Sequence, residues 1–194
     1  TQANGQRCST AKGYLTQAKH RNNLTVLTRV AAEKVLLKEG RAIGVQVREK
    51  GVVNRYFAKS EVILCGGAIN SPQLLMLSGI GPRAELEEKG IFVQQDLPGV
   101  GQNLQDHLDA IVQYTCKARE GYAVALGALP SYVKATADYA FRRKGIFSSN
   151  IAEAGGFVSS SLATQGPDIQ FHFLPAILND HGRQLAFGYG YGLH

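Results

Sequence analysis

The stretch EVILCGGAINSPQLLMLSGIGP, residues 61–82, decides the fold of this chain. Residues 61–65 form a short and mostly apolar run, which predicts a strand buried on both faces. Two glycines follow at once. Ser71 is a good N-cap and Pro72 suits the first helical position, so the pattern predicts a helix over residues 72–77. A strand, a glycine turn and a helix in this order indicate an α/β fold.

The turn between the predicted strand and helix is suited to binding a ligand. Gly66 and Gly67 let the backbone approach a ligand closely. The free N–H groups and the positive dipole end of the helix favour a phosphate or another electron-rich group. The residues alone leave an ordinary strand-to-helix turn as the alternative. Neither G-x-G-x-x-G nor a Walker motif occurs in the sequence.

Upstream of this stretch the sequence predicts an antiparallel meander. Residues 34–38, 42–48 and 52–58 are short, rich in β-branched residues and separated by turns. Basic side chains alternate with the apolar ones, so one face of this sheet is expected to meet water. A further strand is expected over residues 24–28 and a short helix over residues 11–18.

Downstream the pattern predicts a second sheet with helices. The expected elements are helices over residues 83–89 and 131–144 and strands over residues 91–93, 110–116, 168–174 and 187–194. The longer helix is amphipathic, with Val133, Ala137, Ala140 and Phe141 on one stripe. With the meander, these elements give a mixed α/β (α+β) fold class.

Composition excludes several classes of protein. The chain has 194 residues, of which 44% are hydrophobic, so it is not a disordered chain. No apolar run approaches the roughly 18 residues of a membrane span, and the polar start shows no secretory signal. The three cysteines, Cys8, Cys65 and Cys116, are odd in number and far apart, which excludes a disulfide framework or a four-cysteine zinc site and favours a reducing compartment.

The positive charge of the chain is concentrated in its first third. Residues 1–60 carry 12 Lys and Arg against 3 Asp and Glu, while the whole chain has a net charge of +6. Such a bias is one mark of a surface that binds an anionic partner, and a non-enzymatic binding or scaffold module is therefore the alternative function. The basic residues are spread singly through apolar stretches, which favours the solvated face of a sheet and predicts no nucleic-acid partner.

Residues 67–81, GAINSPQLLMLSGIG, resemble the second signature of the GMC oxidoreductases, the glucose–methanol–choline family of FAD-dependent enzymes. The constrained positions that fit are Gly67, Ala68, Ser71, Pro72, Leu74, Leu75, Ser78, Gly79, Ile80 and Gly81. Flanking segments agree in the right order, at residues 5–9, 24–28, 97–107 and 150–157. The resemblance covers essentially the whole chain, and it is greatest to the choline-dehydrogenase-like branch and its members that act on aliphatic alcohols.

The resemblance implies two domains and an activity. Residues 1–108 are expected to be the middle part of a Rossmann-like FAD-binding domain that includes the meander, and residues 109–194 an incomplete substrate-binding domain. The expected reaction oxidises a primary alcohol, aliphatic or choline-like, to the aldehyde by hydride transfer to flavin. The family's dinucleotide motif and catalytic histidine have no counterpart here, so no catalytic residue is assigned and an internal segment, inactive alone, is expected.

The resemblance also implies the residues that contact FAD. The backbone at Ala32 is expected to contact the adenine, and a loop at the edge of the flavin domain contains Asn103. The positions expected beside the ADP part of FAD are Cys65, Gly66, Gly67 and Ala68. Glu153 aligns with a carboxylate that faces the cationic head of the substrate in choline-type enzymes. The same motif occurs in relatives that use uncharged alcohols, so Glu153 does not decide the substrate.

The sequence leaves two roles open for one of the histidines. No set of metal ligands is expected. Asp106 and His107 suit either a base with its orienting carboxylate or a structural hydrogen bond. His172 is expected on a strand, as a packing or pocket-wall residue. The expected partner is a small-molecule alcohol, with no integral membrane segment, and the electron acceptor and oligomeric state stay open. The expected location is cytoplasmic, with a peripheral position at the inner membrane as the second possibility.

Overall fold

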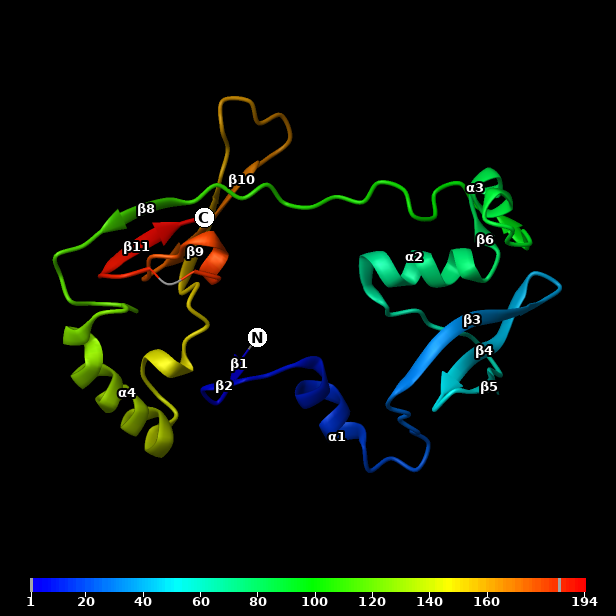
Figure 1. The fold of residues 1–194 in the computed structure, drawn as a ribbon, viewed down its shortest axis with the longest axis horizontal. Helices are drawn as coiled ribbons and strands as arrows, with labels where there is room; N and C mark the ends of the chain where they lie inside the picture. Colours follow the sequence, from blue (N-terminus) through cyan, green and yellow to red (C-terminus); the bar gives the residue numbers. More distant parts are fainter. Residues whose placement is uncertain (1, 185) are drawn as a thin grey trace. The chain divides into compact units, whose positions relative to one another are not determined.

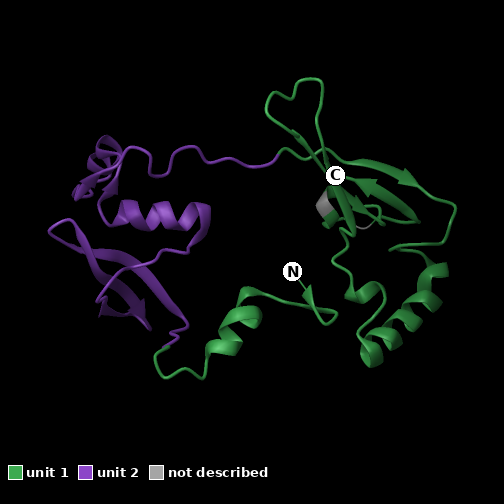
Figure 2. Cartoon of the chain, turned by 180° about the vertical axis from the view of Figure 1, so that it is seen from behind, with its two compact units in different colours: residues 1–24, 108–194 green, residues 25–107 purple. Residues whose placement is uncertain are grey.

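The computed structural model describes residues 2–184 and 186–194. The chain forms two compact units (Figure 2). One unit is Thr25–His107, and the other combines Thr1–Leu24 with Leu108–His194. Each unit contains both helices and strands, and most of the strand pairs are antiparallel. The predicted mixed α/β class is therefore confirmed.

The unit Thr25–His107 is built on the predicted meander. Strands β3 (Val30–Lys38), β4 (Arg41–Glu49) and β5 (Val52–Phe57) form an antiparallel sheet in the order β3-β4-β5 (Figure 1). Alternation places Val35 and Val47 in the core, where they are 3% and 5% exposed. The sequence expectation for this sheet is confirmed.

Helix α2 (Gly67–Leu77) follows the meander and packs against β3. After two intervening residues, the short strand β6 (Ile80–Gly81) pairs in parallel with β7 (Gln95–Asp96), and helix α3 (Arg83–Glu88) connects them. Leu86 of α3 is 1% exposed and anchors this connection in the core of the unit. The predicted second helix, over residues 83–89, is thereby confirmed.

Three predicted strands of this unit are wrong. Residues 24–28, 61–65 and 91–93 have no strand structure. A strand needs a hydrogen-bonded neighbour, and none of the described residues pairs with these segments as a ladder. Ile63, which the apolar run predicts to be buried, is 72% exposed. The apolar run at residues 61–65 therefore does not form a strand, because an apolar sequence also needs a partner strand to pair with.

The other unit contains a four-stranded antiparallel sheet. Its strands are β8 (Val112–Thr115), β9 (Ala154–Val158), β10 (Ile169–Leu174) and β11 (Gly190–Leu193), in the order β8-β11-β10-β9. The strands predicted within residues 110–116, 168–174 and 187–194 are confirmed, and β9 was not predicted. Three short 3₁₀ turns complete this region, η2 (Leu126–Ala128), η3 (Ile146–Ser148) and η4 (Asp180–Gly182).

The N-terminal segment of this unit is short and mostly exposed. Strands β1 (Gln2–Ala3) and β2 (Gln6–Arg7) form a small hairpin. A π-helical turn η1 (Ala11–Leu15) continues into α1 (Thr16–Ala18), which confirms the helix predicted over residues 11–18. None of the described helices is both long enough and apolar enough to cross a membrane.

Helix α4 (Leu129–Arg142) confirms the predicted amphipathic helix but buries a different face. Val133 and Phe141 of the predicted stripe are 64% and 88% exposed, whereas Ala135 is 8% exposed. Tyr132 lies on the inward face, where its hydroxyl accepts a hydrogen bond from the N–H of Ala123 at 3.0 Å and donates one to the carbonyl of Ala123 at 2.8 Å. This pair of hydrogen bonds ties the Tyr132 face of the helix to Ala123.

Candidate cofactor-binding site

The glycine turn leads directly into α2, earlier than the sequence predicts. The helix begins at Gly67 with Gly66 as its N-cap, so the expected start at Pro72 is wrong and Pro72 lies inside the helix. Gly67 has a φ of +86°, in the left-handed region that disfavours every residue with a Cβ. Ser71 is not the N-cap; its hydroxyl oxygen accepts a hydrogen bond from the N–H of Gly66 at 3.0 Å.

A large groove opens beside this turn, with a volume of about 980 Å³. Three of the predicted cofactor residues line it: Ala32 from β3, and Cys65 and Gly66 from the turn. Apolar side chains supply much of the remaining wall, among them Val47 and Leu64. Its volume falls in the range of about 300–1,000 Å³ typical of ligand and cofactor sites.

A second cavity of about 540 Å³ lies along α2. Ala68 and Asn103, two further predicted cofactor residues, line it together with Met76 and Ile91. Gly67 separates Gly66 of the first groove from Ala68 of the second. The structure thus brings the six predicted cofactor residues to the two cavities and to the turn that starts α2.

The polar groups of the first groove come from the backbone and from uncharged side chains. None of the described residues that line it carries a charge. The first N–H groups of a helix lack intrahelical partners and carry a partial positive charge, and α2 presents this end next to an apolar wall. Such a surface suits a ligand that joins a flat apolar ring to an anionic group.

The C-terminal end of α2 is held by Ser78, a position of the signature to which the sequence analysis assigned no structural role. Ser78 is fully buried, accepts a hydrogen bond from the N–H of Val35 at 2.8 Å and donates one to the carbonyl of Leu74 at 2.6 Å. The sequence marks this serine as a constrained position of the signature, between an apolar helical run and Gly79, but does not reveal its hydrogen bonds. The serine ties α2 to β3, and these two elements form the walls of the groove.

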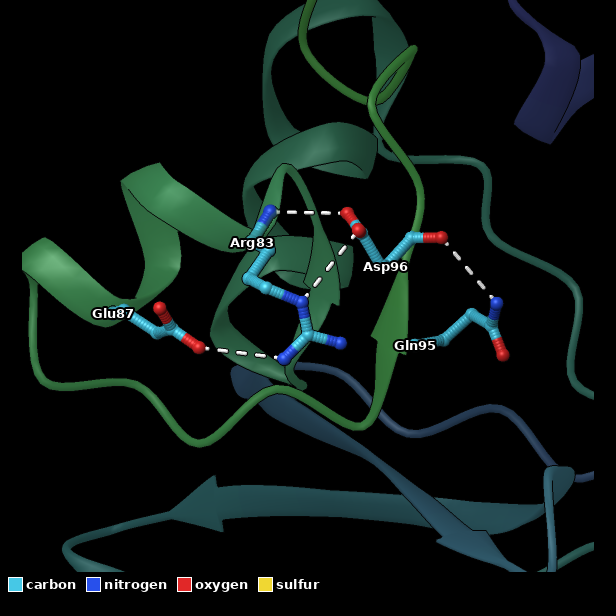
Figure 3. Close-up of polar contacts among 4 residues, drawn as sticks. All are labelled: Arg83, Glu87, Gln95 and Asp96. Carbon is cyan, nitrogen blue, oxygen red and sulfur yellow. Dashed lines mark hydrogen bonds and ion pairs between the residues drawn. The ribbon is translucent and has the colours of Figure 1, made fainter.

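An ion-pair cluster secures the chain after α2 (Figure 3). Asp96 accepts a hydrogen bond from the backbone N–H of Arg83 at 3.1 Å, at the first residue of α3. The guanidinium of Arg83 also lies 3.6 Å from Asp96 and 3.3 Å from Glu87. All three side chains are substantially exposed, so this cluster orients α3 and contributes little to stability.

Glu153 lies in the unit that contains Leu108–His194, whereas the six predicted cofactor residues lie in Thr25–His107. It directly precedes β9, and its backbone N–H donates to the carbonyl of Phe173 on β10 at 3.2 Å. The side chain of Glu153 is exposed. Burial, and to a lesser extent the negative charge of Glu153, raise the pKa of Tyr122 above its ordinary value.

Two of the histidines lie beside aspartates in the structure. Asp106 accepts a hydrogen bond from the backbone N–H of His107 at 2.9 Å, which is the structural alternative. His194 forms a pair that the sequence did not suggest, with Nδ1 3.1 Å from a carboxylate oxygen of Asp109. Within the described part of the chain, no group of three or more His, Cys, Asp or Glu side chains is arranged to hold a metal ion.

Curated relatives align with nearly the whole chain. The alcohol dehydrogenase [acceptor] of Pseudomonas putida is 47% identical over 196 aligned residues, which cover 100% of this chain and 36% of the relative. The oxygen-dependent choline dehydrogenase of Photobacterium profundum is 42% identical over 98% of this chain and 33% of its own length. The chain therefore spans about a third of the length of these relatives.

Solved structures and a family model agree with these relatives. A formate oxidase superposes with a TM-score of 0.73 at 26% identity, over 90% of this chain and 35% of that chain. Pyridoxine 4-oxidase from Mesorbium loti gives a TM-score of 0.70 at 27% identity, over 98% and 34%. The model of the GMC oxidoreductase family matches residues 1–109. The chain belongs to the GMC oxidoreductase family.

Proposed function

We propose that this chain is the segment of an FAD-dependent oxidoreductase that holds the ADP part of the flavin and contributes to the alcohol site. The observation that carries the proposal is the groove of about 980 Å³ lined by Ala32, Cys65 and Gly66 beside the start of α2. Family membership supports the same assignment. In this proposal residues 1–108 belong to the FAD-binding domain and residues 109–194 to the substrate-binding domain.

The residues of the groove fit this group chemically. Adenine is flat and largely apolar on its faces, and the wall formed by Ala32, Val47 and Leu64 offers it apolar contact without a charged side chain. The pyrophosphate is anionic, and the N-terminal end of α2, with its partial positive charge and a glycine turn that carries no side chain, would suit it. Gly67, Ala68 and Asn103 extend this contact along α2. When bound, FAD supplies the acceptor for a hydride from the alcohol carbon.

The proposed substrate is a primary alcohol that is oxidised to the aldehyde. This proposal is supported by the relatives, which are an alcohol dehydrogenase and choline dehydrogenases. Glu153 is the proposed substrate contact of this chain, because its exposed carboxylate is able to pair with a cationic head or accept a hydrogen bond from a hydroxyl. The cytoplasmic location, with a peripheral position at the inner membrane, stays a prediction.

The alternative, a binding module for an anionic partner, is not favoured. Its basis was the basic first third of the chain. On the meander, Arg48 of this segment pairs with Glu33 at 2.5 Å and donates to the carbonyl of Gly51 at 3.0 Å. These contacts neutralise part of the charge, and the relatives are enzymes of one oxidoreductase family.

The test of the proposed function is the flavin content of Gly67 variants in the whole enzyme that contains this chain. Gly67→Val should remove bound FAD, because a β-branched residue strongly disfavours the left-handed φ of +86° and the turn must rearrange. Gly67→Asn is the matched control, since asparagine tolerates this conformation, and it should retain more FAD. Flavin absorbance per protein is measured after purification.

The fold of each Gly67 variant is followed by circular dichroism. A Gly67→Val enzyme with native circular dichroism and no flavin supports the proposal. A folded Gly67→Val enzyme with the flavin content of the unmutated protein contradicts the assignment of this turn to FAD.

A further inference from the structure

A strained turn precedes Glu153 in the unit that contains Leu108–His194. Ile151 has a φ of +67°, which is rare and strained for a β-branched residue. Its N–H donates to the side-chain oxygen of Ser149 at 2.9 Å, and the N–H of Ala152 donates to the carbonyl of Asn150 at 2.9 Å. Such strain persists only where surrounding contacts hold it.

Tyr122 supplies a contact that holds the segment leading into this turn. The hydroxyl of Tyr122 donates to the carbonyl of Ile146 in η3 at 2.6 Å. The backbone of Tyr122 is itself fixed, because its N–H donates to the carbonyl of Pro175 at 2.8 Å. Tyr122 thus connects the segment after β10, through its backbone, with η3, through its hydroxyl.

Side chains at both ends of the turn also affect the pKa of Tyr122. A hydrogen bond with the side chain of Ser149 lowers the pKa of Tyr122, and the charge of Glu153 raises it. Burial is the larger effect, so the net shift is upward and the phenol stays protonated at neutral pH. A protonated hydroxyl is the form that donates to Ile146.

We infer that Tyr122 is a positioning residue, which holds η3 and the turn at residues 149–153 so that the Glu153 carboxylate occupies one defined place for the alcohol. This inference rests on the proposed function of Glu153 as a substrate contact. Tyr122 is not assigned a contact with substrate. It acts through the Ile146 carbonyl, Ser149 and the strained Ile151.

The test is Tyr122→Phe in the whole enzyme, because this change keeps the ring and removes only the hydroxyl. The KM for the alcohol should rise about three- to tenfold, the worth of one hydrogen bond, with kcat changed by less than about twofold. Amide hydrogen exchange at residues 149–153 should become faster. Tyr114→Phe is the matched control, because Tyr114 is 54% exposed and stacks on Tyr191.

A second variant, Glu153→Gln, separates the inference from the proposed function. If Tyr122→Phe leaves both KM and amide exchange unchanged while Glu153→Gln raises KM, the inference is wrong and the role of Glu153 stands. If Tyr122→Phe speeds exchange but Glu153→Gln leaves KM unchanged, the link from Tyr122 to the substrate is wrong. If the unmutated enzyme holds no flavin and oxidises no alcohol, the proposed function itself fails.

Discussion

The backbone N–H of Val35 donates a hydrogen bond to the side-chain oxygen of Ser78, 43 residues later in the chain, at 2.8 Å. Strand β3 stands at the edge of its three-stranded sheet, so its outward N–H groups have no strand partner in that sheet. Ser78 satisfies one of them and also donates to the carbonyl of Leu74. The result is a fixed distance between β3 and α2, the two elements that frame the proposed flavin groove.

Ser78→Ala should destabilise this unit measurably. The substitution leaves the N–H of Val35 buried without its partner, which costs about 1–3 kcal/mol. Ser60→Ala is the control, because Ser60 is exposed, and it should stay within about 0.5 kcal/mol. The measurement is urea unfolding of the whole enzyme followed by circular dichroism. Equal unfolding midpoints for the two variants would show that the hydrogen bond contributes nothing.

Alanine substitutions at Gly79 and Gly90 distinguish the cost of a strained φ from the cost of a steric clash of the new Cβ. Both have a left-handed φ, +84° and +67°, so alanine costs about 1–2 kcal/mol at either position. A Cβ at Gly79 would lie 2.3 Å from the carbonyl oxygen of Phe92, whereas one at Gly90 meets nothing within 4 Å. Gly79→Ala should therefore cost about 1–3 kcal/mol more than Gly90→Ala in thermal or urea unfolding. Similar losses for both would contradict the close approach at Phe92.

Asp168 should titrate below its ordinary range. Its two carboxylate oxygens accept hydrogen bonds from the hydroxyl and the N–H of Ser160, at 2.6 and 2.7 Å, and these lower the pKa of Asp168. The stabilisation linked to this shift is present above the unfolded aspartate pKa of about 3.9 and is lost as the pH falls through the lower folded value.

Ser160→Ala tests this assignment. It should raise the pKa of Asp168 toward the ordinary aspartate value, since the largest cause of the shift is removed. The neighbouring Ser159→Ala should leave it unchanged. Carboxyl-carbon chemical shifts followed by NMR across the acid range give the pKa directly. A pKa that is the same in the Ser160→Ala variant and the unmutated protein would contradict the role of Ser160.

The strand β4 shows where the sequence pattern was sufficient to predict an element. Residues 42–48 alternate apolar and polar side chains and pair with segments directly before and after, and β4 forms as expected. Residues 61–65 are apolar enough for a strand but find no ladder partner among the described residues. A local apolar pattern therefore predicts that a segment is able to form a strand, but it does not show whether a hydrogen-bonded neighbour is present.

Part of the candidate site was predicted from the sequence, and part of it was not. The glycine turn and the groove residues Ala32 and Cys65 were predicted through the family resemblance, and the structure brings them to one cavity. The helix start was misplaced, because Ser71 and Pro72 look like a cap while the left-handed Gly67 already turns the chain into α2. The roles of Ser78 and Tyr122 were not predicted, because their hydrogen bonds, to Val35 and Ile146, depend on tertiary packing.

Cys65 offers the most direct test of the central proposal, that the groove beside α2 binds the ADP part of FAD. This thiol is free, exposed and lines the groove, and Cys116 is a second free and exposed thiol in the other unit. The measurement is the alkylation rate of each cysteine, by mass spectrometry, in the flavin-loaded and the flavin-stripped whole enzyme. Bound FAD should slow alkylation of Cys65 strongly and leave Cys116 unchanged. Equal rates at Cys65 with and without flavin would contradict the assignment of this groove.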